Sequence, residues 1–133
     1  MNWRGTLQPG KLDDAVHVAD WMPTLTGLVG GVPEGDPQWD GTDIWPLISG
    51  EGTGPQDRSI FWNFRRGQQL GLRYGDWKLI SREGEEAELF NISEDPYEER
   101  ELSSDCPETV DQLTEMLRAQ RDLDDSAKRE DAD

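Results

Sequence analysis

Four short runs of aromatic and aliphatic residues alternate with brief polar connections in the second half of the chain. The runs cover residues 59–64, 69–74, 77–82 and 88–92. A glycine occurs in each of the connections between them. Short runs of this composition, separated by tight glycine-containing turns, are typical of β-hairpins. The pattern therefore predicts a four-stranded antiparallel sheet.

A helical pattern follows these runs. Asp105, followed three residues later by Glu108, matches a capping box, in which side chains accept backbone N–H groups at a helix start. Apolar residues then recur on one face of the predicted helix, at Val110, Leu113 and Leu117. We expect this helix to end near residue 121 and to pack on the sheet.

The first half of the chain has a different pattern. Residues 15–19 form a short, largely apolar run that fits a buried strand. Asp20 can then cap a helix, and Pro23 falls in its first turn, where the missing N–H costs nothing. One face continues with Leu25, Leu28 and Val29 up to Gly30-Gly31. The pattern predicts a buried strand followed by a short helix.

Changes of composition divide the chain into regions. A loop rich in glycine and proline at residues 51–58 separates a compact apolar patch, residues 44–48, from the predicted sheet. The last twelve residues contain six acids and two cations and have almost nothing to bury. We therefore predict three regions: an incomplete domain segment at 1–50, an α+β region at 51–121 and a disordered acidic tail at 122–133.

The charge balance excludes some classes of partner. The chain has 133 residues, with 13 Lys and Arg against 29 Asp and Glu, for a net charge of -16. Such a surface repels nucleic acids and anionic membranes. Lysine is scarce, with only three among the 13 cations. An acidic excess with little lysine predicts a surface adapted to high salt, where screening reduces the self-repulsion.

Targeting signals are not evident in this sequence. No apolar run approaches the roughly 18 residues that a membrane span requires. The start, Met1 to Gly5, lacks the apolar core of a secretion signal. The localisation is therefore unknown.

A search for catalytic residues finds no convincing set. The chain has one cysteine, Cys106, and one histidine, His17, which excludes an internal disulfide and an ordinary zinc site. A nucleophilic Cys106 would need a base, and Pro107 and Glu108 beside it provide no cation to lower the thiol pKa. We interpret Cys106 as a bystander at a helix start. His17 lies in an apolar run and is expected to be packed or hydrogen-bonded.

Three further motifs are weak. The acidic loop with Asp36, Asp40 and Asp43 could suggest calcium, but its spacing differs from the twelve-residue calcium loop, so we expect a solvated turn. The segment 50–54 is rich in glycine but lacks the lysine of a phosphate-binding loop. Asn91-Ile92-Ser93 satisfies the N-glycosylation pattern, which often arises by chance. We therefore predict neither catalytic nor metal-binding residues in this chain.

The order and spacing of four motifs resemble the C-terminal end of the sulfatase family. The residues within the motifs are most similar to those of arylsulfatase B-like enzymes. The motifs are HVADWMPTL from His17, DGTDIWPLI from Asp40, LRYGDWKL from Leu72 and ELFNISEDPYE from Glu88. Each motif alone is weak, but all four occur in family order. One departure is Glu101, which stands where the family usually has Asn.

The resemblance implies a division of roles. Residues 1–50 would be the last strand and helix of an α/β catalytic domain, and 51–121 the small C-terminal sulfatase subdomain. The formylglycine nucleophile, made from a Cys/Ser-x-Pro-x-Arg motif, and the calcium ligands of the family would lie in a missing N-terminal catalytic domain. Cys106 does not supply that motif, because Pro107 is adjacent to it.

The resemblance implies a fragment of a sulfuric ester hydrolase that acts on sulfated sugars or aryl sulfates and is inactive alone. Two alternatives stay open. One is a free-standing acidic binding module without catalysis, and the other is an ester hydrolase of the same superfamily that acts on phosphates or phosphonates. In the family the first strand of the small domain runs near the substrate pocket. Trp62 or Asn63 is therefore a candidate for the pocket rim, although a plain core role for Trp62 is the simpler interpretation.

Overall fold

The computed structural model describes residues 3–31, 34–35, 37–55, 58–64 and 67–130, with side chains up to residue 125. The chain divides into two compact units, Met1–Gln56 and Asp57–Asp133. The expected division after residue 50 therefore falls six residues earlier than the observed one. Within the described residues, no helix is long and apolar enough to cross a membrane.

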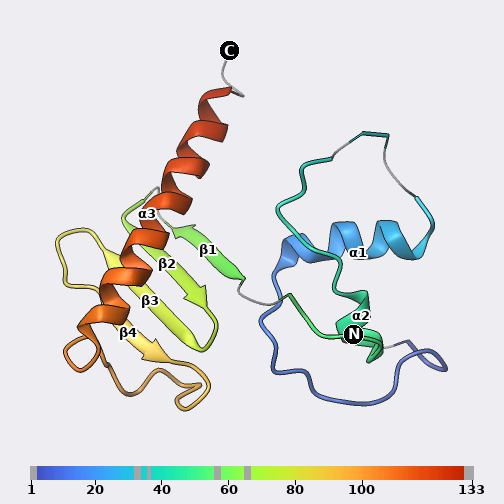
Figure 1. Ribbon diagram of the computed structural model, residues 1–133, viewed down its shortest axis with the longest axis horizontal. Helices are drawn as coiled ribbons and strands as arrows, with labels where there is room; N and C mark the ends of the chain where they lie inside the picture. The colour runs from blue at the N-terminus through green and yellow to red at the C-terminus, as the bar shows by residue number, and fades with distance from the viewer. Residues whose placement is uncertain (1–2, 32–33, 36, 56–57, 65–66, 131–133) are drawn as a thin grey trace. The chain divides into compact units, whose positions relative to one another are not determined.

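The second unit contains the predicted sheet. Its strands are β1 (Ser59–Phe64), β2 (Gln69–Tyr74), β3 (Trp77–Arg82) and β4 (Glu88–Asn91). They pair antiparallel in the order β1-β2-β3-β4. Figure 1 shows the helix α3 (Pro107–Glu130) lying across one face of this sheet. The α+β fold class and the four-stranded antiparallel sheet are thus confirmed.

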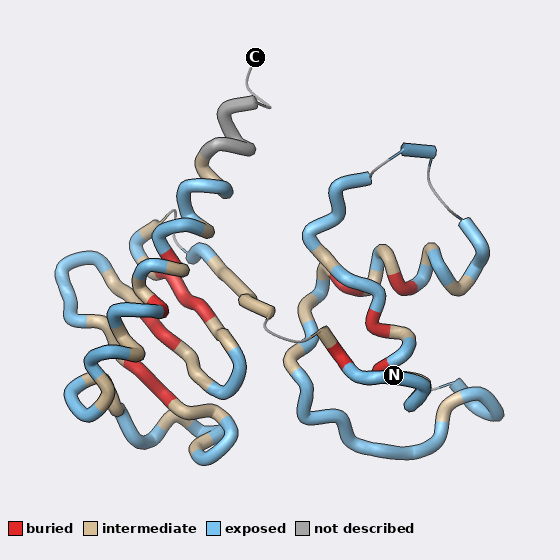
Figure 2. The backbone as a smooth tube through the Cα atoms, viewed as in Figure 1, coloured by how far each residue is buried: buried red, intermediate tan, exposed pale blue. Residues whose placement is uncertain are grey.

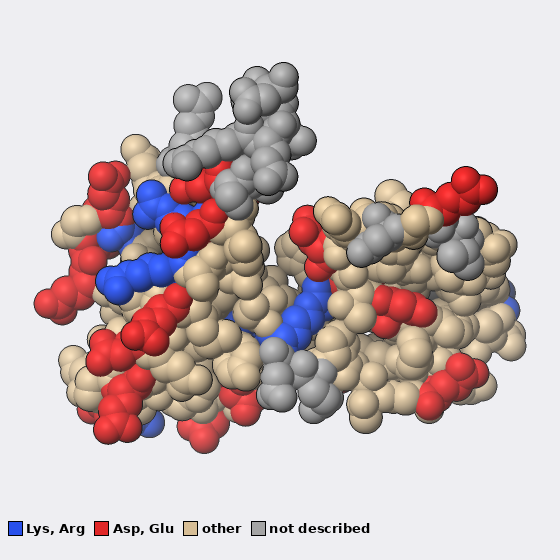
Figure 3. Space-filling model, turned by 45° about the horizontal axis from the view of Figure 1, so that its top comes forward, with Lys and Arg blue, Asp and Glu red and all other residues tan. Residues whose placement is uncertain are grey.

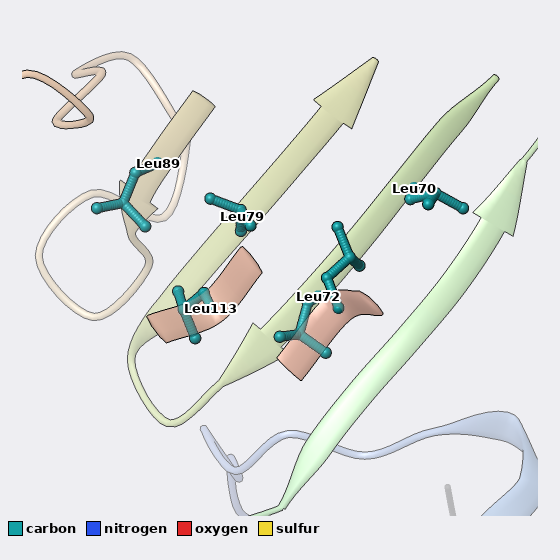
Figure 4. Packing of buried hydrophobic residues seen from close by; sticks show 6 residues of the cluster. Leu70, Leu72, Leu79, Leu89 and Leu113 are labelled. Atoms are coloured by element: carbon teal, nitrogen blue, oxygen red, sulfur yellow. The ribbon is translucent and has the colours of Figure 1, made fainter. Parts of the chain in front are cut away.

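Leucines fill the space between the sheet and α3. Because side chains alternate between the faces of a strand, every second residue of the sheet points toward the helix. The buried cluster consists of Leu70, Leu72, Leu79, Leu89, Leu113 and Leu117, of which five are labelled in Figure 4. Leu72, Leu79 and Leu89 have no exposed surface at all. Burial of a leucine contributes about 2 kcal/mol, so this cluster holds the second unit together.

The helix α3 differs from the prediction at both ends. It begins at Pro107, and the side chain of Asp105 forms an ion pair with Arg100 at 3.9 Å. At its C-terminal end it continues past residue 121 to Glu130, through most of the segment expected to be disordered. Arg121 Nε and Asp125 Oδ2, one turn apart, lie 3.8 Å from each other. The prediction considered only burial, whereas favourable helix formers and such pairs extend a helix without a core contact.

The segment after β4 covers the outer edge of that strand. Leu102 N–H donates to Leu89 C=O at 2.9 Å, and Leu89 N–H donates to Glu101 Oε1 at 3.0 Å. Ser103 N–H donates to the same oxygen at 2.6 Å. The bond from Leu89 is the main cause of a lowered pKa of the Glu101 carboxyl. Glu101 thus connects the segment after β4 to the sheet.

The first unit contains short helical segments. They are a 3₁₀ turn (Val18–Asp20), α1 (Trp21–Leu28) and α2 (Trp45–Ser49). The strand expected at 15–19 is wrong: His17 caps the 3₁₀ turn, and Val18 is 76% exposed. A lone apolar run becomes a buried strand only beside other strands, and the described part of this unit has none. The local hydrogen bonds of His17 therefore determine its conformation.

Buried polar side chains join the segments of the first unit. Asp20 and Thr24 are both fully buried. The sequence suggested that the Asp20 side chain caps α1, but it makes no capping hydrogen bond there. It instead accepts N–H groups from His17 at 2.7 Å and Thr42 at 3.0 Å. Thr24 Oγ1 donates to Asp20 C=O at 2.6 Å and accepts from Ile44 N–H at 2.9 Å. These bonds connect α1 to the segment before α2.

Gly41 allows the same two segments to approach each other closely. A Cβ atom at this position would lie 2.1 Å from Ala19 C=O. Any other residue would therefore force the two backbones apart. Figure 2 shows few buried residues in this unit, and among the described residues 3–31, 34–35 and 37–55 the buried hydrophobic ones are Ile44 and Leu47.

Candidate functional site

The two predicted rim residues point to opposite faces of the sheet. Asn63 belongs to the α3 face, and its Nδ2 donates to Asp124 Oδ2 on α3 at 3.3 Å. Trp62 belongs to the other face, beside Gly71 of β2. Of the two, only Trp62 lies on the face that α3 leaves open.

Gly71 determines how the Trp62 ring lies. A Cβ atom at position 71 would fall 2.1 to 2.3 Å from three atoms of the indole, Cε2, Cζ2 and Nε1. The ring therefore lies directly against the backbone of β2. Contact with a neighbouring strand fixes the indole in place, although Trp62 remains partly exposed. The sequence places Gly71 in a strand, but only the strand register brings it under Trp62.

Lys78 extends over the same ring from β3. Its Nζ lies 5.6 Å from the centre of the Trp62 ring, within the range of a cation–π interaction. The same Nζ forms an ion pair with Glu98 Oε1 at 2.5 Å, and both side chains are at most a third exposed. Glu98 has a φ of 58°, a left-handed conformation that is uncommon for a residue with a side chain. The pair fastens the loop after β4 to the open face of the sheet.

The cysteine and histidine have structural surroundings. Cys106 is partly buried just before α3, and its C=O accepts from Val110 N–H at 3.1 Å. His17 Nδ1 accepts from Ala19 N–H at 3.3 Å, which agrees with the expected hydrogen-bonded histidine. The described hydrogen bonds of both residues order the starts of helical segments.

The acidic loop also has a structural role where it is described. Asp43 Oδ1 accepts from Trp45 N–H at 2.8 Å, which orders the start of α2. Asp40 is exposed, and Asp36 lies outside the described residues. In the described part of the chain, no group of three or more His, Cys, Asp or Glu residues could hold a metal ion.

A cavity of about 670 Å³ lies in the first unit, which the sequence did not predict. It is lined mainly by apolar residues, among them Leu12, Val16, Trp21 and Ile48. Trp3 also lines it and packs against Trp45, with ring centres 5.7 Å apart. None of the described residues that line it has an ionisable side chain, so these residues offer shape and apolar surface but no acid or base.

Acidic side chains are spread over the visible surface of both units in Figure 3, and cations are fewer. This distribution matches the net charge of -16. Against this background, the open face of the sheet is unusual because it carries Arg73 and Lys78 on neighbouring strands, beside Trp62. An aromatic ring with cations beside it can bind a ligand that has both a flat apolar surface and a negative charge.

The sequence of this chain is similar to part of a known protein. The chain is 29% identical to Arylsulfatase J of Mus musculus over an alignment of 152 residues, covering 78% of this chain and 25% of that protein. No family model matches the chain.

Solved structures have a similar fold. Ps i-CgsB, solved in complex with k-i-k-neocarrahexaose, has a TM-score of 0.63 and 26% identity, over 74% of this chain and 23% of that one. Phosphonate Monoester Hydrolase of Agrobacterium radiobacter has a TM-score of 0.51 and 21% identity, over 78% and 24%. At 21% identity, the similarity to the phosphonate monoester hydrolase shows the fold alone. The chain spans about a quarter of the length of the relatives it matches.

Proposed function

We propose that this chain, which is related to the C-terminal portion of the sulfatase family, completes a sulfuric ester hydrolase that acts on sulfated sugars or aryl sulfates. The observation that carries the proposal is the similarity to Arylsulfatase J, which extends over 78% of this chain but only 25% of that protein. In this proposal the chain supplies structure and substrate contacts, and it does not hydrolyse sulfate esters alone.

The proposed partner is an N-terminal catalytic portion that this chain does not contain. Exposed apolar side chains in the first unit support the proposal of such a partner, because a large exposed apolar patch usually marks a contact with another protein. The exposed fractions are 76% for Val18, 61% for Met22, 51% for Leu25 and 82% for Val29. These residues lie in or beside the 3₁₀ turn and α1. In this proposal the partner covers them.

The proposed calcium ion and formylglycine belong to that partner as well. The residues described here do not fit either group, since they include no cluster that could hold a metal. Cys106 is followed directly by Pro107 at the start of α3, so it does not match the Cys/Ser-x-Pro-x-Arg motif. No step of the reaction is therefore assigned to residues of this chain.

Trp62 is the proposed contact with the substrate. Its ring lies against Gly71 on the face that α3 leaves open, and in this proposal the exposed part of the residue contacts the sugar. Trp62→Phe in a full-length enzyme should raise KM for a sulfated sugar several-fold and leave a small aryl sulfate almost unchanged. Equal losses on both substrates, together with a lower melting temperature, would instead assign Trp62 to the core.

Expression of two polypeptides tests the main proposal. One is the chain as it stands, and the other is the product of the reading frame extended upstream of Met1. We expect 4-nitrophenyl sulfate to be hydrolysed only by the extended product, whose added sequence should include Cys/Ser-x-Pro-x-Arg. Turnover by the chain alone, lost on mutation of its own residues, would contradict the proposal.

Two other results would favour the alternatives. An upstream region without coding sequence would favour the free-standing acidic binding module. An extended product that hydrolyses phenylphosphonate esters but not sulfate esters would favour the phosphonate hydrolases, whose fold this chain shares.

A further inference from the structure

β1 forms one edge of the sheet. In the strand order β1-β2-β3-β4 its neighbour is β2, on one side alone (Figure 1). Among the described segments, only β2 is joined to Ser59–Asn63 by backbone hydrogen bonds. Alternate N–H and C=O groups of an edge strand point outward, away from the sheet. The outer side of β1 thus presents a row of donors and acceptors to which another strand can bind.

This edge lacks the features that usually prevent strand pairing, which are charge, proline and bulges. β1 contains no charged residue and no proline, although 32% of the chain is charged, and each of the other three strands has a charged residue. Its six residues pair one to one with β2, without a bulge. The opposite edge differs, because Glu101 and Leu102 bond to the outward backbone groups of Leu89. One edge of the sheet is therefore covered and the other is open.

The composition of β1 favours pairing with a further strand. Ile, Phe and Trp occupy four of its six positions, and such residues stabilise strands and cross-strand pairs. A strand that joins this edge needs a free edge of its own. The described part of the first unit contains no strand, whereas β1 of a second copy has such an edge.

We propose that β1 is a dimerisation edge, at which two copies of this chain pair their β1 strands antiparallel across a two-fold axis. The pairing joins the two four-stranded sheets. Side-chain alternation places Ile60, Trp62 and Phe64 of one copy on the same face as their counterparts in the other. Because neither strand contains a charged residue, the seam brings no like charges face to face. Each copy has one open edge, so the association closes at two copies. This inference is independent of the proposed function.

The pairing should be weak and should depend on salt. Six residues span about 20 Å at about 3.4 Å per residue, which makes a small interface beside the standard size. The net charge of -16 on each copy opposes association, and salt screens this repulsion. We expect a Kd on the order of 100 μM in about 0.5 M KCl, and weaker association in about 0.05 M KCl.

Two measurements on the full 133-residue chain test the proposal. Sedimentation velocity between about 10 μM and about 1 mM, around the expected Kd, gives the number of copies. Hydrogen exchange at the same concentrations locates the seam. The outward amides of β1, at every second residue, should exchange several-fold more slowly in the dimer, while the amides bonded to β2 stay unchanged. A contact made by side chains alone would not produce this alternation.

Matched variants separate the β1 edge from other surfaces. Ile60→Glu places a carboxylate in the seam but opposite Arg73 of β2, a favourable pair that preserves the sheet. It should weaken the dimer by about tenfold or more. Phe64→Glu, at a position that is 55% exposed, is the second variant if the first does not fold. The controls add the same charge at Tyr97, 84% exposed, and at Val29, 82% exposed, and should stay within about twofold of the original chain.

Several results would overturn the inference. These are a monomer at every concentration, a dimer that both β1 variants leave unchanged, or growth beyond two copies. Loss of the dimer in Val29→Glu alone would assign the contact to the first unit. Outward β1 amides that are protected equally at all concentrations would show that the chain covers this edge itself. If they are protected in a monomeric product extended upstream of Met1, the added sequence occupies the edge instead of a second copy.

Discussion

The two units of this chain are stabilised by different kinds of contact. In the second unit, leucines from three strands and α3 form a cluster from which water is excluded. In the first unit, the fully buried side chains include Asp20 and Thr24, and their hydrogen bonds connect segments about twenty residues apart. At the same time two large apolar side chains of α1, Met22 and Leu25, are more than half exposed.

This difference shows which unit has a hydrophobic core of its own. A leucine cluster contributes about 2 kcal/mol for each buried side chain, whereas a typical hydrogen bond contributes about 1 kcal/mol net. The second unit therefore has its own core. The first unit has a specific arrangement of polar contacts but little buried apolar surface, and we expect it to be the less stable of the two.

The largest effect is expected from Leu79→Ala, which would remove the central side chain of the leucine cluster. Leu79 has no exposed surface, so the lost burial and the remaining cavity should lower the free energy of unfolding by about 3 kcal/mol. Urea unfolding, followed by the amide signals of β2 and β3, measures this change. The control Leu123→Ala, at a position that is 62% exposed, should cost less than about 0.5 kcal/mol. Equal losses would mean that the cluster does not stabilise the unit.

Thr24→Val should affect the first unit alone. The substitution keeps the shape of the side chain but removes both bonds of Oγ1 and leaves the buried Ile44 N–H without its acceptor. We expect a loss of about 2 kcal/mol in local stability, measured as faster hydrogen exchange of the Ile44 amide with unchanged exchange in β3. Thr26→Val, in the same helix, is the control. Faster exchange in both units would contradict their independence.

Salt should stabilise the chain as a whole. At low ionic strength the net charge of -16 repels itself, and salt screens this repulsion. The melting temperature in 2 M KCl should exceed that in 0.1 M KCl by about 5 °C, corresponding to about 1 kcal/mol. An uncharged osmolyte at equal osmolality is the control. A flat response to KCl would identify the composition as that of an ordinary acidic surface.

The smallest effect concerns Glu101 and depends on pH. Its pKa is lowered from 4.5 in the folded chain, so its contribution is present above that value and disappears as the pH falls through the folded pKa. Glu101→Gln should lower stability by about 0.5 kcal/mol at pH 7, a small value because the carboxyl is exposed. The difference from the original chain should shrink as the pH is lowered from 7 to 3.

Glu99→Gln, an exposed neighbour, is the control for this pH dependence. Its stability should follow that of the original chain at both pH values. If the effect of Glu101→Gln were the same at pH 3 and pH 7, the bond from Leu89 N–H to the carboxylate would not be its cause.

The sequence predicted the second unit well because its elements depend on nearby residues. Each strand pairs with the next one along the chain, so the spacing of apolar runs and turns contained most of the information. The prediction failed at residues 15–19, where an apolar run alone cannot show whether neighbouring strands exist. The sequence offered Trp62 or Asn63 as a rim residue, and the strand register places them on opposite faces of the sheet.

The arrangement on the open face of the sheet needed the register of the strands. Gly71 and Arg73 are ordinary strand residues in the sequence, and their significance comes from their partners, Trp62 and Lys78. A glycine inside a strand can indicate a close approach, but it does not identify the side chain that approaches. The cross-strand pairing of these residues became visible only in three dimensions.

The bonds along the outer side of β4 have a consequence for solubility. An open strand edge can recruit a strand from another molecule and begin aggregation. At Leu89 both outward backbone groups are already taken, the N–H by Glu101 and the C=O by Leu102. The connection to α3 thus prevents another strand from pairing with Leu89 at this edge of the sheet. A fusion or truncation that displaced residues 101–102 would turn this edge into a template for polymerisation.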